Sequence, residues 1–244
     1  MGNISIIKQS KGIRITLLIL LGGLLAGIIP TAFAQEGVFG GTRINEVHGT
    51  VYVLPHDGEY WIEATVNYPL ETGDQVRSEA ESRAEIVLFN GTIFRIDELT
   101  TMTLDNVSPE SRSEVVYVGL DEGKLYVLQP DRGSHLVIQA GAQNITAEAT
   151  GGALFRIDSF SNETLQVFVH SGQLQLNSAP ATNRISAGQM VTLIQGNQMD
   201  IASLPPQDDF DRWSLGRSEV ITQPRVASRY LPPELGRVYP DLDL

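Results

Sequence analysis

The sequence contains no cysteine, and it has only four histidines, His48, His56, His135 and His170. The absence of cysteine excludes disulfides, thiolate metal sites, cysteine nucleophiles and a lipid anchor on cysteine. No two histidines stand four positions apart, the spacing that places two metal ligands on one face of a helix. We therefore assign no metal ligand.

The loops and turns that mark common enzyme classes are also missing. The chain has neither a glycine-rich phosphate-binding loop nor the G-x-S-x-G turn of α/β-hydrolases. Two acidic clusters remain, Glu79, Glu81 and Glu85, and Asp208, Asp209 and Asp211; the first is expected by chance in so acidic a chain, and the second matches no calcium loop. We expect a protein that is not an enzyme, with no catalytic or cofactor-binding residue and no cofactor.

Basic residues are scarce. Lysine and arginine total 17 against 29 aspartates and glutamates, a net charge of −12. Such a balance argues against nucleic acid and against anionic lipid as partners.

What is present at the start of the chain is the pattern of a secretory signal peptide. Three basic residues, Lys8, Lys11 and Arg14, precede an apolar run over 15–29, and the motif Ala32-Phe33-Ala34 follows. This order predicts a leader over residues 1–34 that is cleaved after Ala34, because the apolar run is shorter than the roughly 20 residues that span a bilayer. No later stretch is apolar enough to span a membrane. We expect a periplasmic or secreted protein, and the leader's loss would bring the net charge to −15.

From residue 43 to about 202 the chain alternates between short β-branched or aromatic runs and tight-turn residues. The strongest hairpin signal is residues 84–89 and 92–97 around Asn90-Gly91, which suits a type I′ turn. Further hairpins are predicted at 146–158, 165–176 and 190–201. We expect an all-β domain over 43–202, of β-solenoid-like or sandwich form.

The domain contains an internal repeat. Residues 91–97 (GTIFRID) align with residues 152–158 (GALFRID), which predicts one supersecondary unit used twice. The period-two pattern places four charged residues on one face, Arg95, Asp97, Arg156 and Asp158. They could form a polar binding ladder, but we favour cross-strand charge pairs on the solvent-exposed face of a half-buried sheet.

Residues 203–244 form a proline-rich linker and tail, expected to be mostly irregular. An aspartate before residues 210–220 is suited to cap one short helix there.

The order of these segments resembles the FecR-like domain, an extracytoplasmic module. The resemblance rests on Leu70–Ser78, similar to the family's "l-x-x-G-D-x-v-x-T", on Ala84–Thr92, similar to "a-x-l-x-f-x-D-G-s", and on Ala187–Val191, similar to "a-G-e-x-v". Asn90 replaces the usual aspartate. Residues 208–217 also resemble a segment, D-x-F-D-x-W-x-x-x-R, that follows such domains in exported proteins.

The resemblance implies a non-catalytic binding or interaction module of the bacterial cell envelope, with envelope sensing or signalling as its context. Family members that control sigma factors carry a cytoplasmic region and a membrane helix before the domain, whereas a leader stands in that place here. The implied partner is an envelope protein. The alternative is an envelope polysaccharide or cell-wall ligand, for which the stacking candidates are Tyr60, Trp61, Tyr126 and Trp213.

Overall fold

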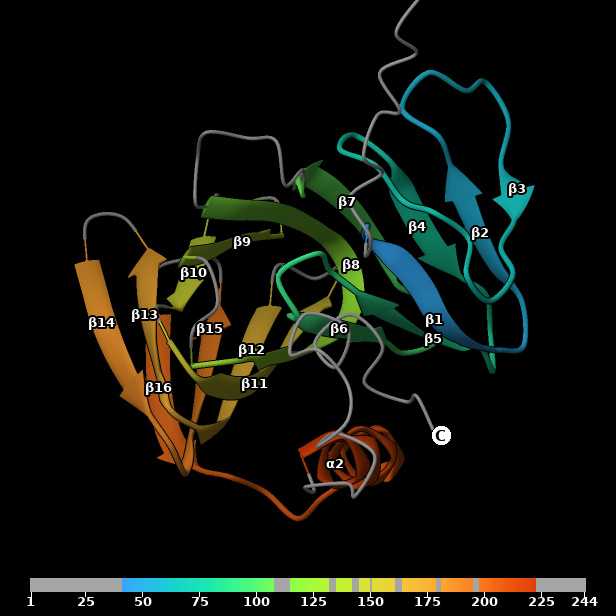
Figure 1. Cartoon of the computed structure of the whole chain (residues 1–244). Helices are drawn as coiled ribbons and strands as arrows, with labels where there is room; N and C mark the ends of the chain where they lie inside the picture. The colour runs from blue at the N-terminus through green and yellow to red at the C-terminus, as the bar shows by residue number, and fades with distance from the viewer. Residues whose placement is uncertain are drawn as a thin grey trace, which may run out of the picture. The chain divides into compact units, whose positions relative to one another are not determined.

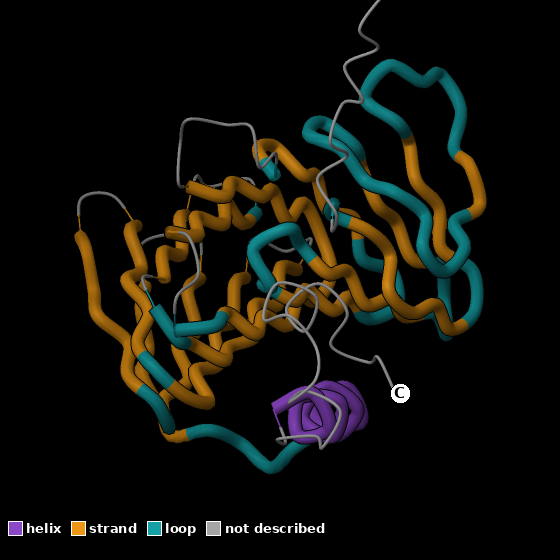
Figure 2. The backbone as a smooth tube through the Cα atoms, in the orientation of Figure 1, coloured by secondary structure: helices purple, strands orange, loops and turns teal. Residues whose placement is uncertain are grey.

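The computed structural model describes residues 41–107, 115–131, 135–141, 145–149, 151–160, 164–178, 181–194 and 198–222 (Figure 1). The predicted leader (1–34) and the tail beyond residue 222 lie outside these residues. Strands dominate, as Figure 2 shows in orange, and the predicted all-β fold is confirmed. Within the described part of the chain no helix has the length and apolar character needed to cross a membrane.

The strands form two sheets that share one strand, β8 (Val115–Gln129). In spatial order, sheet A consists of β1 (Arg43–His48), β5 (Arg83–Val87), β6 (Ile93–Ile96), β8, β11 (Ala153–Phe160), β12 (Thr164–Ser171), β15 (Gln189–Ile194) and β16 (Gln198–Ser203). Sheet B consists of β3 (Ile62–Glu63), β2 (Val51–Leu54), β4 (Gln75–Ser78), β7 (Thr101–Asn106), β8, β9 (His135–Ala140), β10 (Ile145–Ala149), β13 (Gln173–Ser178) and β14 (Ala181–Ser186).

The two sheets enclose one hydrophobic core. Inward-facing residues of sheet A, such as Phe94 and Phe155, belong to the same buried cluster as Ile138 and Leu176 of sheet B. Alternation along each strand produces this core, because every second side chain points to the same face. The chain passes repeatedly between the layers and thereby builds the sandwich.

Strand β8 changes sheets in its middle. Its first part pairs with β7 and, in parallel, with β9, whereas its second part pairs with β6 and β11 (Figure 1). Gly123 lies at the change with φ +103°, and a Cβ there would be 2.4 Å from the Cα of Thr100. Only glycine fits this position without a shift of the backbone.

The hairpin at 84–97 is present, but its turn differs from the predicted type I′. Gly91 has a positive φ and Asn90 does not. The Gly91 N–H donates to the Leu88 carbonyl oxygen and the Leu88 N–H to that of Thr92, the pattern of a type I turn followed by a left-handed glycine. The side chain of Asn90 accepts the Thr92 N–H instead (2.9 Å).

Of the other predicted hairpins, the one formed by β15 and β16 is confirmed. The pairings predicted at 146–158 and 165–176 are wrong, because β10 and β11 lie in different sheets, as do β12 and β13. The glycine turns between them carry the chain from one layer to the other. These turns lie together, since a Cβ on Gly172 would be 2.3 Å from the carbonyl oxygen of Gly152.

The predicted short helix is present as α2 (Asp209–Thr222). It is the one helix among the described residues, and it lies against sheet A (Figures 1 and 2).

Candidate functional site

The two copies of the internal repeat, on β6 and β11, flank the second half of β8. Arg95 and Arg156 both lie opposite Tyr126. In the next row Asp158 lies opposite Lys124, whose Nζ is also 2.8 Å from the Asp97 carboxylate. The predicted common face of these charged residues is therefore confirmed.

This face is not exposed to solvent, and that part of the prediction is wrong. Arg95 is 0% exposed and Asp97, Arg156 and Asp158 are at most 4% exposed. The cause is α2, which covers the row with Phe210 at its centre. The Phe210 ring packs edge-on against Tyr126, with ring centroids 6.0 Å apart.

The N-terminal end of α2 is fixed by reciprocal capping and by Arg156. The Asp208 carboxylate accepts the Asp211 N–H (2.8 Å), and the Asp211 carboxylate accepts the Asp208 N–H (3.1 Å). Arg156 donates to both carboxylates, at 2.8 Å and 3.1 Å, while its fork also holds Asp158 at 2.6 and 2.7 Å. The capping aspartate predicted from the sequence therefore also binds the sheet.

The later turns of α2 are fixed by Glu85 and Arg95. Arg95 donates to the Glu85 carboxylate (2.6 Å), the Ser214 carbonyl oxygen (2.9 Å) and the Ser218 hydroxyl (2.8 Å). Arg217, from the helix, donates twice to Glu85, at 2.9 and 2.8 Å, and also pairs with Glu46. One buried carboxylate thus joins a strand arginine to a helix arginine.

The charges beneath the helix shift the pKa values of the carboxyl groups that anchor it. Burial alone would raise the pKa of Glu85, but Arg217 and Arg95 outweigh it and hold that pKa below the ordinary value. The pKa of Asp208 is also lowered, because the Asp211 N–H and Arg156 outweigh its partial burial. Burial raises the pKa of the Tyr126 hydroxyl, with Asp211 adding to the effect, so this group stays neutral.

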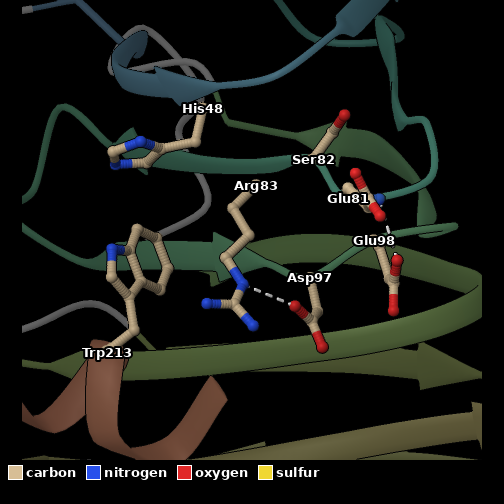
Figure 3. Close-up of a pocket in the computed structure, with 7 residues that line it drawn as sticks. All are labelled: His48, Glu81, Ser82, Arg83, Asp97, Glu98 and Trp213. Carbon is tan, nitrogen blue, oxygen red and sulfur yellow. Dashed lines mark hydrogen bonds and ion pairs between the residues drawn. The ribbon is translucent and has the colours of Figure 1, made fainter. Parts of the chain in front are cut away.

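A pocket of about 410 Å³ opens where one edge of α2 meets the sheet (Figure 3). We call it the helix-edge pocket; its lining residues are His48, Glu81, Ser82, Arg83, Asp97, Glu98 and Trp213. His48 and Trp213 form an aromatic end and Glu81 and Glu98 an acidic end, with Arg83 and Asp97 between them (Figure 3).

The polar groups of the helix-edge pocket are ordered by each other. Arg83 Nε donates to Asp97 (2.7 Å), and the guanidinium of Arg83 lies 5.7 Å from the centroid of Trp213. The Glu98 carboxylate accepts the backbone N–H of Glu81 (2.8 Å), a residue with a left-handed backbone at φ 55°. Both glutamates are exposed, so their charges face solvent and any molecule that enters.

The four aromatic residues predicted for stacking do not form one surface. Tyr126 is 0% exposed beneath α2 and cannot meet a ligand in this structure. Trp213 walls the helix-edge pocket, whereas Trp61 packs on the guanidinium of Arg77 in sheet B at 4.6 Å. Tyr60 is 77% exposed beside Trp61 in the chain.

The histidines and the glutamate cluster are likewise dispersed. Each histidine lies near one carboxylate, and among the described residues no group of three or more histidine and acidic side chains could hold a metal ion. Glu85 is buried under the helix, Glu79 pairs with Arg77, and Glu81 lines the helix-edge pocket.

Sequence reasoning did not identify Arg83, Glu98 or His48 as members of a site. Strand pairing brings them together, because His48 on β1 lies opposite Arg83 on β5 and the β5–β6 hairpin places Glu98 nearby. The return of α2 then adds Trp213, and no local motif signals that contact. Trp213 was predicted as a candidate from its residue type alone.

No family model matches the chain, and no curated protein matches it. Among solved structures the chain is similar to a candidate anti-sigma factor from Parabacteroides distasonis, with 16% identity and a TM-score of 0.49 over 58% of this chain and 65% of that chain. A second crystal structure of a candidate anti-sigma factor from the same organism gives 15% identity and a TM-score of 0.46 over 53% of this chain and 59% of that chain. The similarity thus spans less than two thirds of either neighbour.

Proposed function

We propose that this chain is a non-catalytic, FecR-like binding module of the bacterial cell envelope, exported by the leader over residues 1–34, that recognises an envelope protein. Sensing or signalling in the envelope is the context we propose for it. The observation that carries the proposal is the helix-edge pocket, an open hollow with an aromatic wall and two exposed carboxylates.

The chemistry of this pocket suits a basic side chain on a polypeptide. Glu81 and Glu98 supply negative charge, and Trp213 supplies a face on which an apolar or cationic group can pack. Arg83 is already paired with Asp97, so it does not cancel the two glutamates. The net charge of −12 also attracts a basic partner over a longer range.

The test is affinity capture from envelope extracts with the mature protein and with a Glu81→Gln/Glu98→Gln variant. Glu122→Gln, which removes one exposed carboxylate on β8, is the control. We expect a captured protein that is retained by the control, lost from the double variant and released by salt. Capture of no protein, or equal capture by the double variant, would contradict the proposal.

Export is tested separately by expression of the full chain in a bacterium, followed by fractionation and N-terminal sequencing. We expect the periplasm or medium to contain a protein that begins at Gln35. A chain that keeps Met1 and stays in the cytoplasm would contradict export.

We propose polysaccharide binding as a second function, because the chemistry of a different surface suits it. The outer face of sheet B carries amide and hydroxyl side chains that the described helix does not cover.

A further inference from the structure

One row of residues crosses the outer face of sheet B from strand to strand. The pairing registers place these residues opposite one another in turn, and they are Gln75, Thr103, Gly119, Gln139, Thr146, Asn177 and Thr182. Residues opposite one another in neighbouring strands point to the same face, so these side chains form a continuous line, which we call the amide–hydroxyl row. From Gln75 to Thr182 every side chain in it is an uncharged amide or hydroxyl except at Gly119, and the next position in register, Leu54 of β2, is apolar and ends the row.

Part of the amide–hydroxyl row is held in place by its own hydrogen bonds. The Thr182 hydroxyl donates to the side-chain oxygen of Asn177 (2.9 Å), and the Asn177 amide donates to the Thr146 hydroxyl (3.2 Å). The same amide also donates to Glu148 (2.6 Å). A ligand that met these groups would find them already oriented, which lowers the entropic cost of binding.

The corresponding row on the outer face of sheet A is covered by another element, so the exposure of the row on sheet B is a distinguishing feature. There, Glu85, Arg95, Tyr126 and Arg156 are charged or aromatic and lie buried beneath α2. On sheet B, Gln139 and Thr182 are exposed, and no described helix lies over them.

A hollow of about 300 Å³ adjoins the row on β9, β10, β13 and β14. It is lined by His135, Glu148, Gln173, Leu174, Gln175 and Arg184. Next to it in register is Tyr117, which is 43% exposed and lies opposite Val137 of β9. The surface therefore combines a polar line, a hollow and an accessible aromatic ring.

Gly119 has no side chain, and the carboxylate of Asp105 lies beside the space that a side chain would fill. A Cβ on Gly119 would lie 3.4 Å from the carboxylate of Asp105. Asp105 adds a hydrogen-bond acceptor for a hydroxyl group, and its charge disfavours an acidic ligand at this point.

We propose that the outer face of sheet B binds an uncharged polysaccharide chain laid along the amide–hydroxyl row. Strands in a sheet are spaced about 4.8 Å apart, so the row offers one polar side chain at nearly each sugar unit of an extended polysaccharide. Amides and hydroxyls both donate and accept, as sugar hydroxyls do. A protein interface would instead place apolar and aromatic groups at its centre, and an acidic polysaccharide would be repelled by a chain of net charge −12.

This inference uses a surface separate from the helix-edge pocket, so the two can fail independently. The experiment measures binding of the mature protein to soluble β-glucan and chitin oligosaccharides by calorimetry and affinity electrophoresis, with polygalacturonate as the acidic comparison. The test variant is Gln139→Ala/Thr146→Val on the row. The control is Gln198→Ala/Thr192→Val, which makes the same changes on sheet A.

We expect binding of at least one neutral oligosaccharide, about 30-fold weaker for the row variant and unchanged for the sheet A control, since two lost hydrogen bonds of about 1 kcal/mol each amount to about 2 kcal/mol. Binding should also be unchanged in Glu81→Gln/Glu98→Gln. No detectable binding of any neutral sugar, binding of polygalacturonate alone, or binding by the row variant as tight as that of the unmodified protein would each overturn the proposal. None of these results bears on protein capture at the helix-edge pocket.

Discussion

Glu85 is the residue on which the contacts between helix and sheet converge. Its side chain is 0% exposed, and its two oxygens accept from Arg95 on the neighbouring strand and from Arg217 on α2. A buried carboxylate is tolerated only when such partners compensate for its lost hydration. The same holds for the arginines, which depend on Glu85.

The substitution Glu85→Gln keeps the shape of this side chain and removes its charge. It leaves Arg95 and Arg217 without their shared partner, and we expect unfolding free energy to fall by about 3 kcal/mol, the usual cost of breaking a buried pair. Urea denaturation followed by circular dichroism measures the change.

Glu122→Gln is the matched control, because Glu122 is exposed on β8, and its effect should stay within about 0.5 kcal/mol. Equal stability of the two variants would show that the buried network does not stabilise the docked helix.

At the scale of elements, β8 depends on one glycine for its passage between sheets. Gly123→Ala combines a disfavoured φ of +103° with a Cβ placed 2.4 Å from the Cα of Thr100. Gly188 has φ +85° with nothing within 4 Å of the added Cβ, so Gly188→Ala carries the backbone cost alone.

We expect Gly188→Ala to lower stability by about 1 kcal/mol and Gly123→Ala to lower it by clearly more, because the second change also forces strands apart. Thermal unfolding of the two variants makes the comparison. A larger loss from Gly188→Ala would argue against a tight passage at Gly123.

Acid should release α2 from the sheet. The pKa values of Glu85 and Asp208 are lowered in the folded state, so their contribution is complete above the ordinary carboxyl pKa and is lost as pH falls through the lowered values. Release is therefore expected as the pH falls below the ordinary carboxyl pKa of about 4.

The fluorescence of Trp213 reports this release once Trp61, the other tryptophan, is replaced by phenylalanine. Glu85→Gln in the same background should weaken the pH dependence. An emission spectrum that stays constant down to pH 2 would contradict an electrostatic attachment of the helix.

For the whole molecule, α2 completes the packing of sheet A. A chain that ends at Ser203 would expose Tyr126 and Phe168 and leave Arg95 and Arg156 without their helix partners. We expect this truncation to lower the melting temperature strongly and to bind a hydrophobic dye. A chain that ends at Thr222 keeps every contact of α2 described above and is the control; equal melting temperatures would show that the helix is dispensable.

The sequence predicted much of this fold at the level of elements. Alternation and turn chemistry located the strands of the 84–97 and 190–201 hairpins, and an aspartate indicated the helix. The layering could not be predicted. Glycine turns commonly close hairpins, but the turns at Gly151-Gly152 and Gly172 instead carry the chain from one sheet to the other.

The environment of the repeated Arg and Asp residues could not be predicted either. Their common face followed from period two, but their burial depends on Ser214, Arg217 and Asp208, which lie far along the chain. Local pattern carries no information on such distant contacts. Two arginines in the middle of apolar strands were the available signal that a partner element would cover them.

The sharing of β8 between the sheets also determines the order in which the molecule can be completed. Strand β8 joins β6 to β11 in sheet A and β7 to β9 in sheet B, so neither sheet is complete without residues 115–129. The helix is made later still, and until then the charged face of sheet A has no cover. The native structure therefore depends on pairings between segments far apart in the chain, and such distant pairings form more slowly than local hairpins.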